Sequence, residues 1–356
     1  MNGKASVIEV ARRVARARFG HGHPVYLVHA LTARCNARCG FCAWNPEFYD
    51  PREQLSTPAI LKLHADARRA GFVGLSLWGG EPLLHPDFEE IVRHAHELGL
   101  HTNLVTNGFL LEKKLAPVAR YIDRVSISLD LPSPKHDELR KIPGLFAAIV
   151  SGTRALTRAA PDKRVVFVCT LQKANVATET LRQLVELTRE LGAVGVYNGL
   201  REEAATPGGD AGLSEYAPSE AELAGAMALL AKLKREGYPI LNSFTHLDML
   251  AAGPPVYRCH WPKFMLPVEA NGDVVDCMHW GTRPIANLKH AKFEDVLRHP
   301  RLRELSGATG EACHKCVSIH RIEISEVGSG NLEPLRSWRM LRSARRLPLA
   351  PRAAWS

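Results

Sequence analysis

Residues 31–44 read LTARCNARCGFCAW, and the cysteines of this stretch, Cys35, Cys39 and Cys42, have the spacing C-x3-C-x2-C. Three cysteines so close together suggest a metal group with one coordination position left open. A structural zinc site takes four ligands, usually from paired C-x2-C motifs. An iron–sulfur cube bound by three thiolates instead keeps one iron free for an outside ligand. The stretch alone leaves an iron–sulfur site, a zinc site and unligated thiols open, and the surrounding sequence has to decide between them.

Strand and helix patterns alternate outward from this loop. A first strand is expected within 23–31, directly before the cysteines, and five more are expected at 74–78, 102–106, 124–130, 164–171 and 194–197. Helical patterns lie between them, at 56–71, 86–98, 111–120, 145–159 and 178–191. Strands separated by helices of about 10–15 residues are typical of βαβ units and a parallel sheet. We therefore predict an α/β fold with a partial (β/α)6 barrel of the TIM type.

A second motif, Gly79-Gly80-Glu81-Pro82, follows the second expected strand. The cysteine spacing after the first strand and this GGEP motif after the second resemble the radical S-adenosylmethionine (radical SAM) superfamily, over about residues 25–200. The resemblance implies that the three cysteines are catalytic and bind a 4Fe–4S cluster whose free iron takes S-adenosylmethionine. It also implies one-electron cleavage of that cofactor, with flavodoxin or ferredoxin as reducing partner. The resulting 5′-deoxyadenosyl radical would abstract hydrogen from the substrate.

The resemblance assigns further residues to the S-adenosylmethionine site. They are Phe41, Gly79, Gly80, Glu81, Pro82, Asn107, Ser128, Asp130 and Arg140. The two glycines would let the backbone approach the methionyl end of the cofactor, because they have no Cβ atom. Glu81 matches the family acid near the methionyl amino group. Arg140 matches an arginine that neutralises the methionyl carboxylate, with a solvated helix arginine as the alternative interpretation. After Asp130, Leu131-Pro132 departs from the family pattern, in which a glycine is common.

A second cysteine set lies near the C-terminus, at Cys259, Cys277, Cys313 and Cys316. Asn271-Gly272 predicts a β-hairpin that folds Cys277 back towards Cys259. The spacing C-x12-G-x4-C followed by C-x2-C resembles the auxiliary-cluster extension of SPASM and twitch radical SAM enzymes. The resemblance implies a small C-terminal hairpin-plus-helix domain with an auxiliary 4Fe–4S cluster on four thiolates, which accepts an electron from the substrate radical. A zinc ribbon could use the same four thiolates.

Five segments are expected along the chain. They are a basic amphipathic helix over 1–22, the radical SAM core over 23–200, a linker or lid with a helix over 201–255, a twitch-like auxiliary-cluster domain over 256–330 and a basic tail over 331–356. The formal net charge is +9, and the excess of basic residues lies at the two ends. A nucleic-acid-binding protein would spread such residues over one working face, so no nucleic acid is expected.

The location in the cell follows from what the sequence lacks. It has no apolar run of the roughly 18 residues that span a bilayer, and no apolar segment typical of a secretory signal. We therefore expect a cytoplasmic protein, in which eight cysteines indicate metal or redox chemistry and not disulfides. The basic ends also allow peripheral contact with an anionic membrane surface.

The substrate is left open among three classes. The auxiliary cluster favours net oxidation, such as dehydrogenation of a polar small molecule or formation of a cross-link. A membrane lipid and a peptide are the alternatives, although peptide maturases often carry an N-terminal peptide-binding domain, for which there is no room before Cys35. A non-enzymatic iron–sulfur electron carrier is a further interpretation, but a carrier needs no GGEP motif.

Overall fold

The computed structural model of the chain describes residues 4–19, 22–42, 53–200, 213–277, 284–307 and 316–338. Within these ranges one sheet has nine strands, in the order β6-β5-β4-β3-β2-β1-β7-β8-β9. Their bounds are β1 (Tyr26–Thr32), β2 (Gly74–Gly79), β3 (His101–Thr106), β4 (Arg124–Ser128), β5 (Arg164–Leu171), β6 (Val194–Gly199), β7 (Met265–Val268), β8 (Asp273–Val274) and β9 (Ala286–Asn287).

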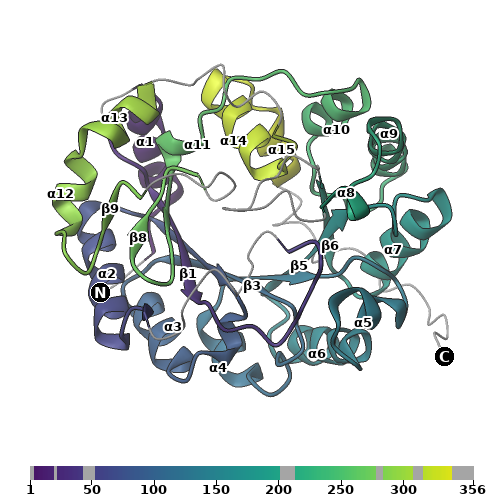
Figure 1. Ribbon diagram of the computed structural model, residues 1–356, viewed down its shortest axis with the longest axis horizontal. Coiled ribbons are helices and arrows are strands. Elements are labelled where there is room, and N and C mark those ends of the chain that lie inside the picture. The colour runs from purple at the N-terminus through teal and green to yellow at the C-terminus, as the bar shows by residue number, and fades with distance from the viewer. Residues whose placement is uncertain are drawn as a thin grey trace.

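Strands β1 to β6 form the parallel part of the sheet. Each pairs in parallel with the next strand along the chain, from Tyr26 opposite Gly74 to Val166 opposite Val194. Figure 1 shows them curving in an arc, and β6 and β9 are the two edges of the described sheet, so the barrel is not closed. The predicted partial barrel is confirmed. Because the strands are parallel, the loops after β1, β2, β3 and β4 meet at one edge.

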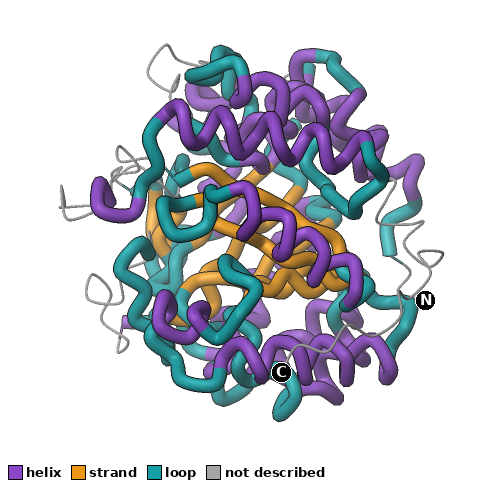
Figure 2. Tube along the Cα trace, turned by 90° about the vertical axis from the view of Figure 1, so that its right-hand side faces the viewer, coloured by secondary structure: helices purple, strands orange, loops and turns teal. Residues whose placement is uncertain are grey.

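Helices between these strands cover the outer side of the arc, as Figures 1 and 2 show. They are α2 (Thr57–Ala70), α3 (Phe88–Glu97), α4 (Leu115–Tyr121), α5 (Lys135–Arg140), α6 (Leu145–Ala159) and α7 (Thr178–Glu190). Local sequence explains their ends. Helix α2 follows its N-cap Ser56 and stops at Gly71, whose φ of +101° is one that glycine adopts readily.

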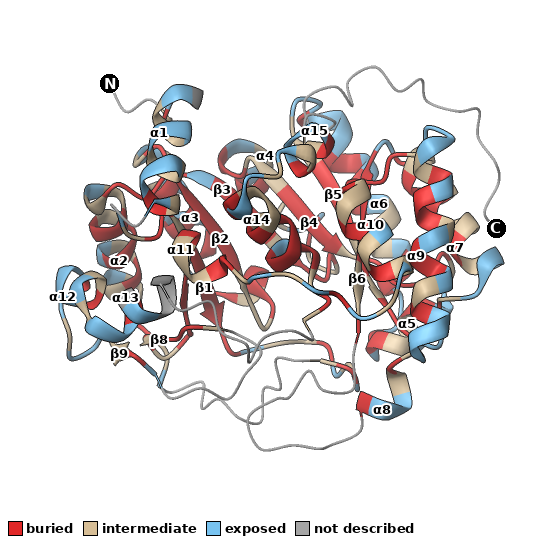
Figure 3. Cartoon of the chain, turned by 90° about the horizontal axis from the view of Figure 1, so that it is seen from above, coloured by how far each residue is buried: buried red, intermediate tan, exposed pale blue. Residues whose placement is uncertain are grey.

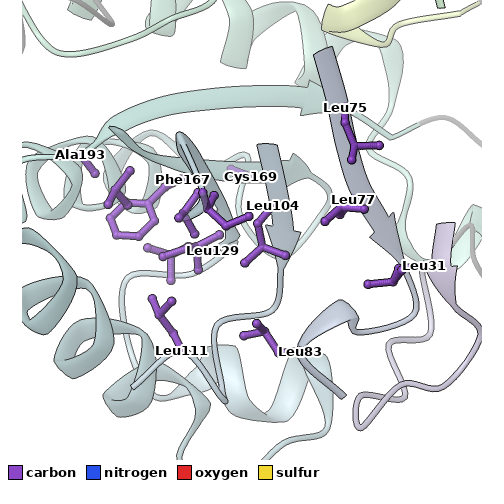
Figure 4. Packing of buried hydrophobic residues seen from close by; sticks show 14 of the residues in the cluster. Leu31, Leu75, Leu77, Leu83, Leu104, Leu111, Leu129, Phe167, Cys169 and Ala193 are labelled. Carbon is purple, nitrogen blue, oxygen red and sulfur yellow. The ribbon is translucent and has the colours of Figure 1, made fainter. Parts of the chain in front are cut away.

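The main hydrophobic core lies between the sheet and these helices. Leu77, Leu104 and Phe167 enter it from β2, β3 and β5, as Figure 4 shows. Cys169 of β5 belongs to the same core and is 2% exposed. Asn175 Nδ2 donates to its Sγ at 3.5 Å. The thiol therefore packs as a small buried hydrophobic group.

The hairpin predicted from Asn271-Gly272 is present, and it extends the barrel sheet. Strand β7 pairs in parallel with β1, with Met265 opposite Tyr26, and then turns back into the antiparallel strand β8. In the turn, Gly272 N donates to Glu269 O at 2.9 Å, and Gly272 has a φ of +91°. A left-handed glycine at the end of a short loop is common in hairpin connections. The auxiliary cysteine region is thus attached to the sheet beside the first cysteine loop.

The remaining helices lie around the open side of the arc, except for the short 3-10 helix after β2, which packs against β1, β2 and β3. They are α1 (Val7–Arg18), the 3-10 helix η3 (Pro82–Leu84), α8 (Leu213–Tyr216), α9 (Glu220–Arg235), α10 (Phe244–Ala251), α11 (Trp261–Phe264), α12 (Phe293–Arg298), α13 (Pro300–Gly307), α14 (Ile319–Ser329) and α15 (Glu333–Trp338). Helices α14 and α15, yellow in Figure 1, lie across the opening. Ile319 packs with Val166, Val194 and Val196, and its backbone N donates to Asn198 Oδ1 at 3.1 Å. Helix α14 therefore covers the inner side of β5 and β6.

The described parts of the two basic ends bury apolar residues in the protein. Val10 and Val14 of α1 pack against a cluster of buried apolar residues that includes Phe264. In α15, Trp338 Nε1 donates to Glu323 Oε2 of α14 at 2.8 Å. Figure 3 shows both helices at the surface of the molecule, where they carry exposed as well as partly buried residues. Among the described helices, none is long and apolar enough to cross a membrane.

Candidate active site

The first cysteine loop leaves the C-terminal end of β1. Cys35, Cys39 and Cys42 are all partly buried, and Cys42 N donates to Cys39 O at 3.2 Å. Burial raises the pKa of the Cys35 thiol to about 11, and neighbouring Glu81 and Cys39 act in the same direction. A bound metal group removes such a proton, because a coordinating thiol is deprotonated.

The number of thiols on this loop bears on the kind of metal group. Within the described ranges, no three His, Cys, Asp or Glu side chains come close enough to hold a single metal ion. An iron–sulfur cube attaches each thiolate to a different iron, and three thiolates leave its fourth iron open. Three partly buried thiols on one loop therefore fit the cube by their number and chemistry.

The GGEP motif packs directly on the backbone of the cysteine loop. Gly80 N donates to Thr32 O and Glu81 N donates to Arg34 O, both at 2.8 Å. A Cβ atom on Gly80 would lie 2.3 Å from Arg34 O, and one on Gly79 would lie 2.7 Å from Thr32 O. Both glycines are thus required for the approach of β2 to the loop. Their contact with the cofactor stays a prediction.

Glu81 holds the ends of β2 and β3 together. Its fully buried carboxylate accepts from Thr106 Oγ1 at 2.7 Å, from Leu83 N at 3.0 Å and from Asn107 N at 2.8 Å. Burial raises the pKa of Glu81, while these hydrogen bonds lower it. Asn107 continues the connection, since its Nδ2 donates to Asn36 Oδ1 of the cysteine loop at 2.8 Å. A carboxylate has about four acceptor positions, so Glu81 keeps one for a further donor.

Asp130 and Arg140 form a buried ion pair beside the cysteines. Arg140 Nε donates to Asp130 Oδ2 at 2.7 Å, and Thr170 N donates to Asp130 Oδ1 at 2.8 Å. Arg140 Nη1 lies 4.0 Å from Cys39 Sγ, and the guanidinium lies 5.4 Å from the centre of the Phe41 ring. Arg140 is 9% exposed, which excludes the solvated helix arginine considered above. The pair presents a fixed positive charge to the first cysteine loop.

The other residues expected around the cofactor lie nearby. Phe41 is 6% exposed and packs with Leu213 and Ala217 at α8, and its ring is 5.9 Å from that of Tyr216. Pro82 is buried at the start of η3, and Ser128 is half-buried at the end of β4. All the expected residues of the first site thus lie at the C-terminal edge of β1 to β4 or on the loops and short helices that follow. Their contact with S-adenosylmethionine remains a prediction.

The second cysteine set converges on one arginine. Arg321 in the first turn of α14 is 2% exposed, and it interacts with Cys277, to which it is hydrogen-bonded, and with Cys316 and Cys259. Its Nε and Nη2 have no hydrogen-bond partner in the described part of the chain. Unpaired buried donors beside three thiols fit an anionic group held by those thiols. Cys313, the fourth expected ligand, lies outside the described residues.

Sequence reasoning missed several residues of both sites. Asn36 and Thr106 carry hydrogen bonds between the cysteine loop, Glu81 and β3, although each is an ordinary polar residue in the sequence. Their positions, one inside the cysteine spacing and one before Asn107, were the available signals. Arg321 follows Cys316 by five residues, and nothing in that spacing distinguishes it from the other arginines.

Two family models match the chain. The model described as radical SAM superfamily matches residues 30–189, and the SPASM model, described as an iron–sulfur cluster-binding domain, matches residues 259–317. The chain is 31% identical to the PqqA peptide cyclase of Methylocella silvestris over 309 residues, covering 83% of this chain and 80% of the relative. It is 28% identical to the PqqA peptide cyclase of Streptomyces rochei over 317 residues, covering 84% and 83%.

Solved structures share the fold. Streptococcus suis SuiB bound to precursor peptide SuiA has a TM-score of 0.65 at 18% identity, covering 88% of this chain and 74% of that one. Native anSMEcpe with bound AdoMet has a TM-score of 0.61 at 12% identity, covering 91% and 100%. The arrangement of sheet and helices described above is therefore found in both.

Proposed function

This chain belongs to the radical SAM superfamily and carries an iron–sulfur cluster-binding SPASM domain, and we propose that it modifies a peptide by forming an oxidative cross-link between two of its side chains. One observation carries the proposal: the chain is 31% identical to a PqqA peptide cyclase over four fifths of both proteins. This likeness favours a peptide over a small molecule or a lipid as substrate. The SPASM match supports an oxidative outcome.

Residues of the first site would hold and orient the cofactors. Cys35, Cys39 and Cys42 would bind the catalytic cluster, and flavodoxin or ferredoxin would reduce it. When bound, the clusters and S-adenosylmethionine supply a hydrogen-abstracting radical and an electron acceptor. Arg140, held by Asp130, would neutralise the methionyl carboxylate with the guanidinium face that is not engaged by the ion pair.

Neighbouring residues would complete the shell. The remaining acceptor position of Glu81 would receive the methionyl amino group. Phe41 would keep the cysteine loop in place through its packing against α8, and Ser128 would face the cofactor from the end of β4. The GGEP backbone would hold its place against the loop through the Gly80–Thr32 hydrogen bond.

The proposed reaction removes two hydrogens from the peptide and forms one bond between two side chains. One hydrogen leaves as an atom to the radical, and the other leaves as a proton. The remaining electron of the substrate goes to the electron acceptor, so that atoms and charge balance. A cross-linked product is therefore lighter than its substrate by two hydrogens.

The experiment offers two deuterated pools to the anaerobically reconstituted full-length protein with dithionite and S-adenosylmethionine. One pool holds peptides encoded next to the gene, and the other holds sugars and aminocyclitols. We expect deuterium in 5′-deoxyadenosine from the peptide pool only, together with a peptide lighter by two hydrogen isotopes. The triple variant Cys35→Ala, Cys39→Ala, Cys42→Ala serves as control and should show neither. Deuterium transfer from the small-molecule pool alone would contradict the proposal.

A further inference from the structure

We infer that Arg321 is a positioning residue of the auxiliary site: its buried positive charge offsets the negative charge of a thiolate-bound cluster and raises that cluster's reduction potential. The inference rests on the proposed function in one respect, the presence of an iron–sulfur cluster on the second cysteine set. It concerns a residue to which neither the sequence motifs nor the cofactor shell assigns a role.

The surroundings hold the Arg321 side chain in one place. It is 2% exposed and among the largest fully buried side chains of the described residues. Its guanidinium carbon lies 4.8 Å from the centre of the Trp261 ring, which is itself 4% exposed. Trp261 begins α11 two residues after Cys259, so the cation–π contact connects α14 to the segment that carries this cysteine.

The three described cysteines reach Arg321 from separate parts of the chain. Cys259 precedes α11, Cys277 follows β8, and Cys316 precedes α14. Cys277 is hydrogen-bonded to the guanidinium, and Cys316 and Cys259 lie close enough to stabilise its charge. A single cation is therefore shared by three predicted ligands of the auxiliary cluster.

The charge balance around Arg321 calls for an anion. In the described part of the chain no carboxylate forms an ion pair with it, and Nε and Nη2 have no hydrogen-bond partner. An isolated buried charge is strongly unfavourable, so buried charges are paired or hydrogen-bonded. Thiolates on a cluster would supply both the counter-charge and the acceptors.

A cation in this place favours the reduced state of the cluster. A cube on four thiolates is anionic and becomes more negative by one charge when it accepts an electron. Hydrogen bonds to cluster sulfurs and nearby charge are among the factors that set the potentials of such clusters. Arg321 would thus make the auxiliary cluster a better electron acceptor for the substrate radical.

The experiment measures the midpoint potential of the auxiliary cluster by a redox titration followed by EPR. It uses the full chain with Cys35, Cys39 and Cys42 all replaced by Ala, so that the signal belongs to the second cysteine set. Into this background go Arg321→Gln, which removes the charge, and Arg321→Lys, which keeps it. Lys263→Gln is the matched control. It also removes one positive charge, and Lys263 lies on α11, two residues after Trp261.

We expect Arg321→Gln to lower the equilibrium constant for one-electron reduction of the cluster at least tenfold. This change corresponds to a midpoint potential that is lower by about 59 mV or more. Arg321→Lys should retain most of the background potential, and Lys263→Gln should leave it unchanged. A glutamine variant with full iron content and an unchanged potential would overturn the inference. Loss of the cluster in both the lysine and the glutamine variant would also overturn the inference, because the positive charge would then not be the property that the site requires.

Failure of the proposed function gives a different result. If the triple-alanine background protein held zinc and no iron, the second cysteine set would bind no auxiliary cluster. Arg321 could then have no role in tuning one. An assembled cluster whose potential ignores Arg321 would leave the proposed function in place and overturn only the inference.

Discussion

Arg140 Nε donates to Asp130 Oδ2 at 2.7 Å, and Arg140 Nη2 lies at the same distance from that oxygen in the ion pair. The other oxygen of Asp130 accepts from the backbone of Thr170 in the adjacent strand. Strand β5 therefore positions the carboxylate, the carboxylate positions the guanidinium, and the guanidinium lies beside Cys39. The first cysteine loop is thus coupled to the sheet through charge as well as through its backbone.

Arg140→Met should destabilise the protein by about 3–5 kcal/mol, because it leaves the buried Asp130 carboxylate without its partner. Adding Asp130→Asn should recover part of this loss, so that the two substitutions are not additive. Anaerobic urea denaturation of the single and double variants measures both effects. Arg93→Gln is the control, since its ion pair with Glu97 lies on the surface and should contribute little. Additive losses would contradict a coupled pair.

Gly80→Ala should displace the first cysteine loop. The new Cβ would lie 2.3 Å from Arg34 O, and a backbone atom cannot move away as a flexible side chain can. Reconstituted protein should then hold about four irons where the unchanged chain holds about eight, and should cleave no S-adenosylmethionine. Gly225→Ala in α9 is the matched control, because a Cβ there meets nothing within 4 Å. Full iron content in the Gly80 variant would show that the loop tolerates the added atom.

Glu81→Gln should weaken the binding of S-adenosylmethionine while the cluster remains. The Glu81 carboxylate accepts three hydrogen bonds, from Leu83, Thr106 and Asn107. The amide of glutamine would turn N–H groups towards one of these donors. Leaving a buried donor unpaired costs about 1–3 kcal/mol, so the ends of β2 and β3 should shift. A titration of the cofactor against the cluster absorbance gives the dissociation constant. Thr106→Val, which removes one donor only, should have a smaller effect, and an unchanged constant in Glu81→Gln would exclude Glu81 from the cofactor shell.

The sequence predicts the barrel well where the signals are local. Strand β5 and helix α6 have the predicted bounds, at Arg164–Leu171 and Leu145–Ala159. Helix α3 begins at Phe88 and not at 86, because Pro86 lies in the turn before the N-cap Asp87. Helix α14 has no regular apolar pattern to detect, since Arg321 and Glu323 are among its buried residues.

For the candidate site, too, the sequence predicts the local motifs but not the contacts between distant residues. Spacing identifies the cysteines and the GGEP motif, and a resemblance then gives their neighbours a role. It does not reveal that Asp130 and Arg140 bind each other, because ion pairing between residues ten positions apart depends on how β4 and α5 meet. The convergence of three distant segments on Arg321 is likewise a property of the folded chain.

Glu269→Gln should stabilise the protein, and its gain in stability over the unchanged chain should be larger at pH 8 than at pH 5. Burial raises the pKa of Glu269 to about 8, above the ordinary value of 4.5, and its Oε2 has no partner among the described residues. The folded state therefore keeps a proton that the unfolded state has lost, so stability decreases as the pH rises from about 4.5 to about 8. Removing the titrating group should remove this slope.

Thermal unfolding of both proteins at several pH values measures this difference. The gap between their melting temperatures should be small near pH 5 and should widen up to pH 8. Asp273→Asn is a second variant, since the Asp273 carboxylate adds to the raised pKa of Glu269, and it should reduce the slope without abolishing it. Parallel curves for Glu269→Gln and the unchanged chain would contradict the assignment.

The parallel pairing of β1 with β7 has a consequence for synthesis and truncation. About 240 residues separate Tyr26 from its partner Met265, so one edge of β1 stays uncovered while most of the chain is made. At about 5–20 residues per second this interval lasts about 12–48 seconds. An unpaired apolar strand edge is a template for aggregation. A chain that ends before β7 would keep this edge exposed permanently.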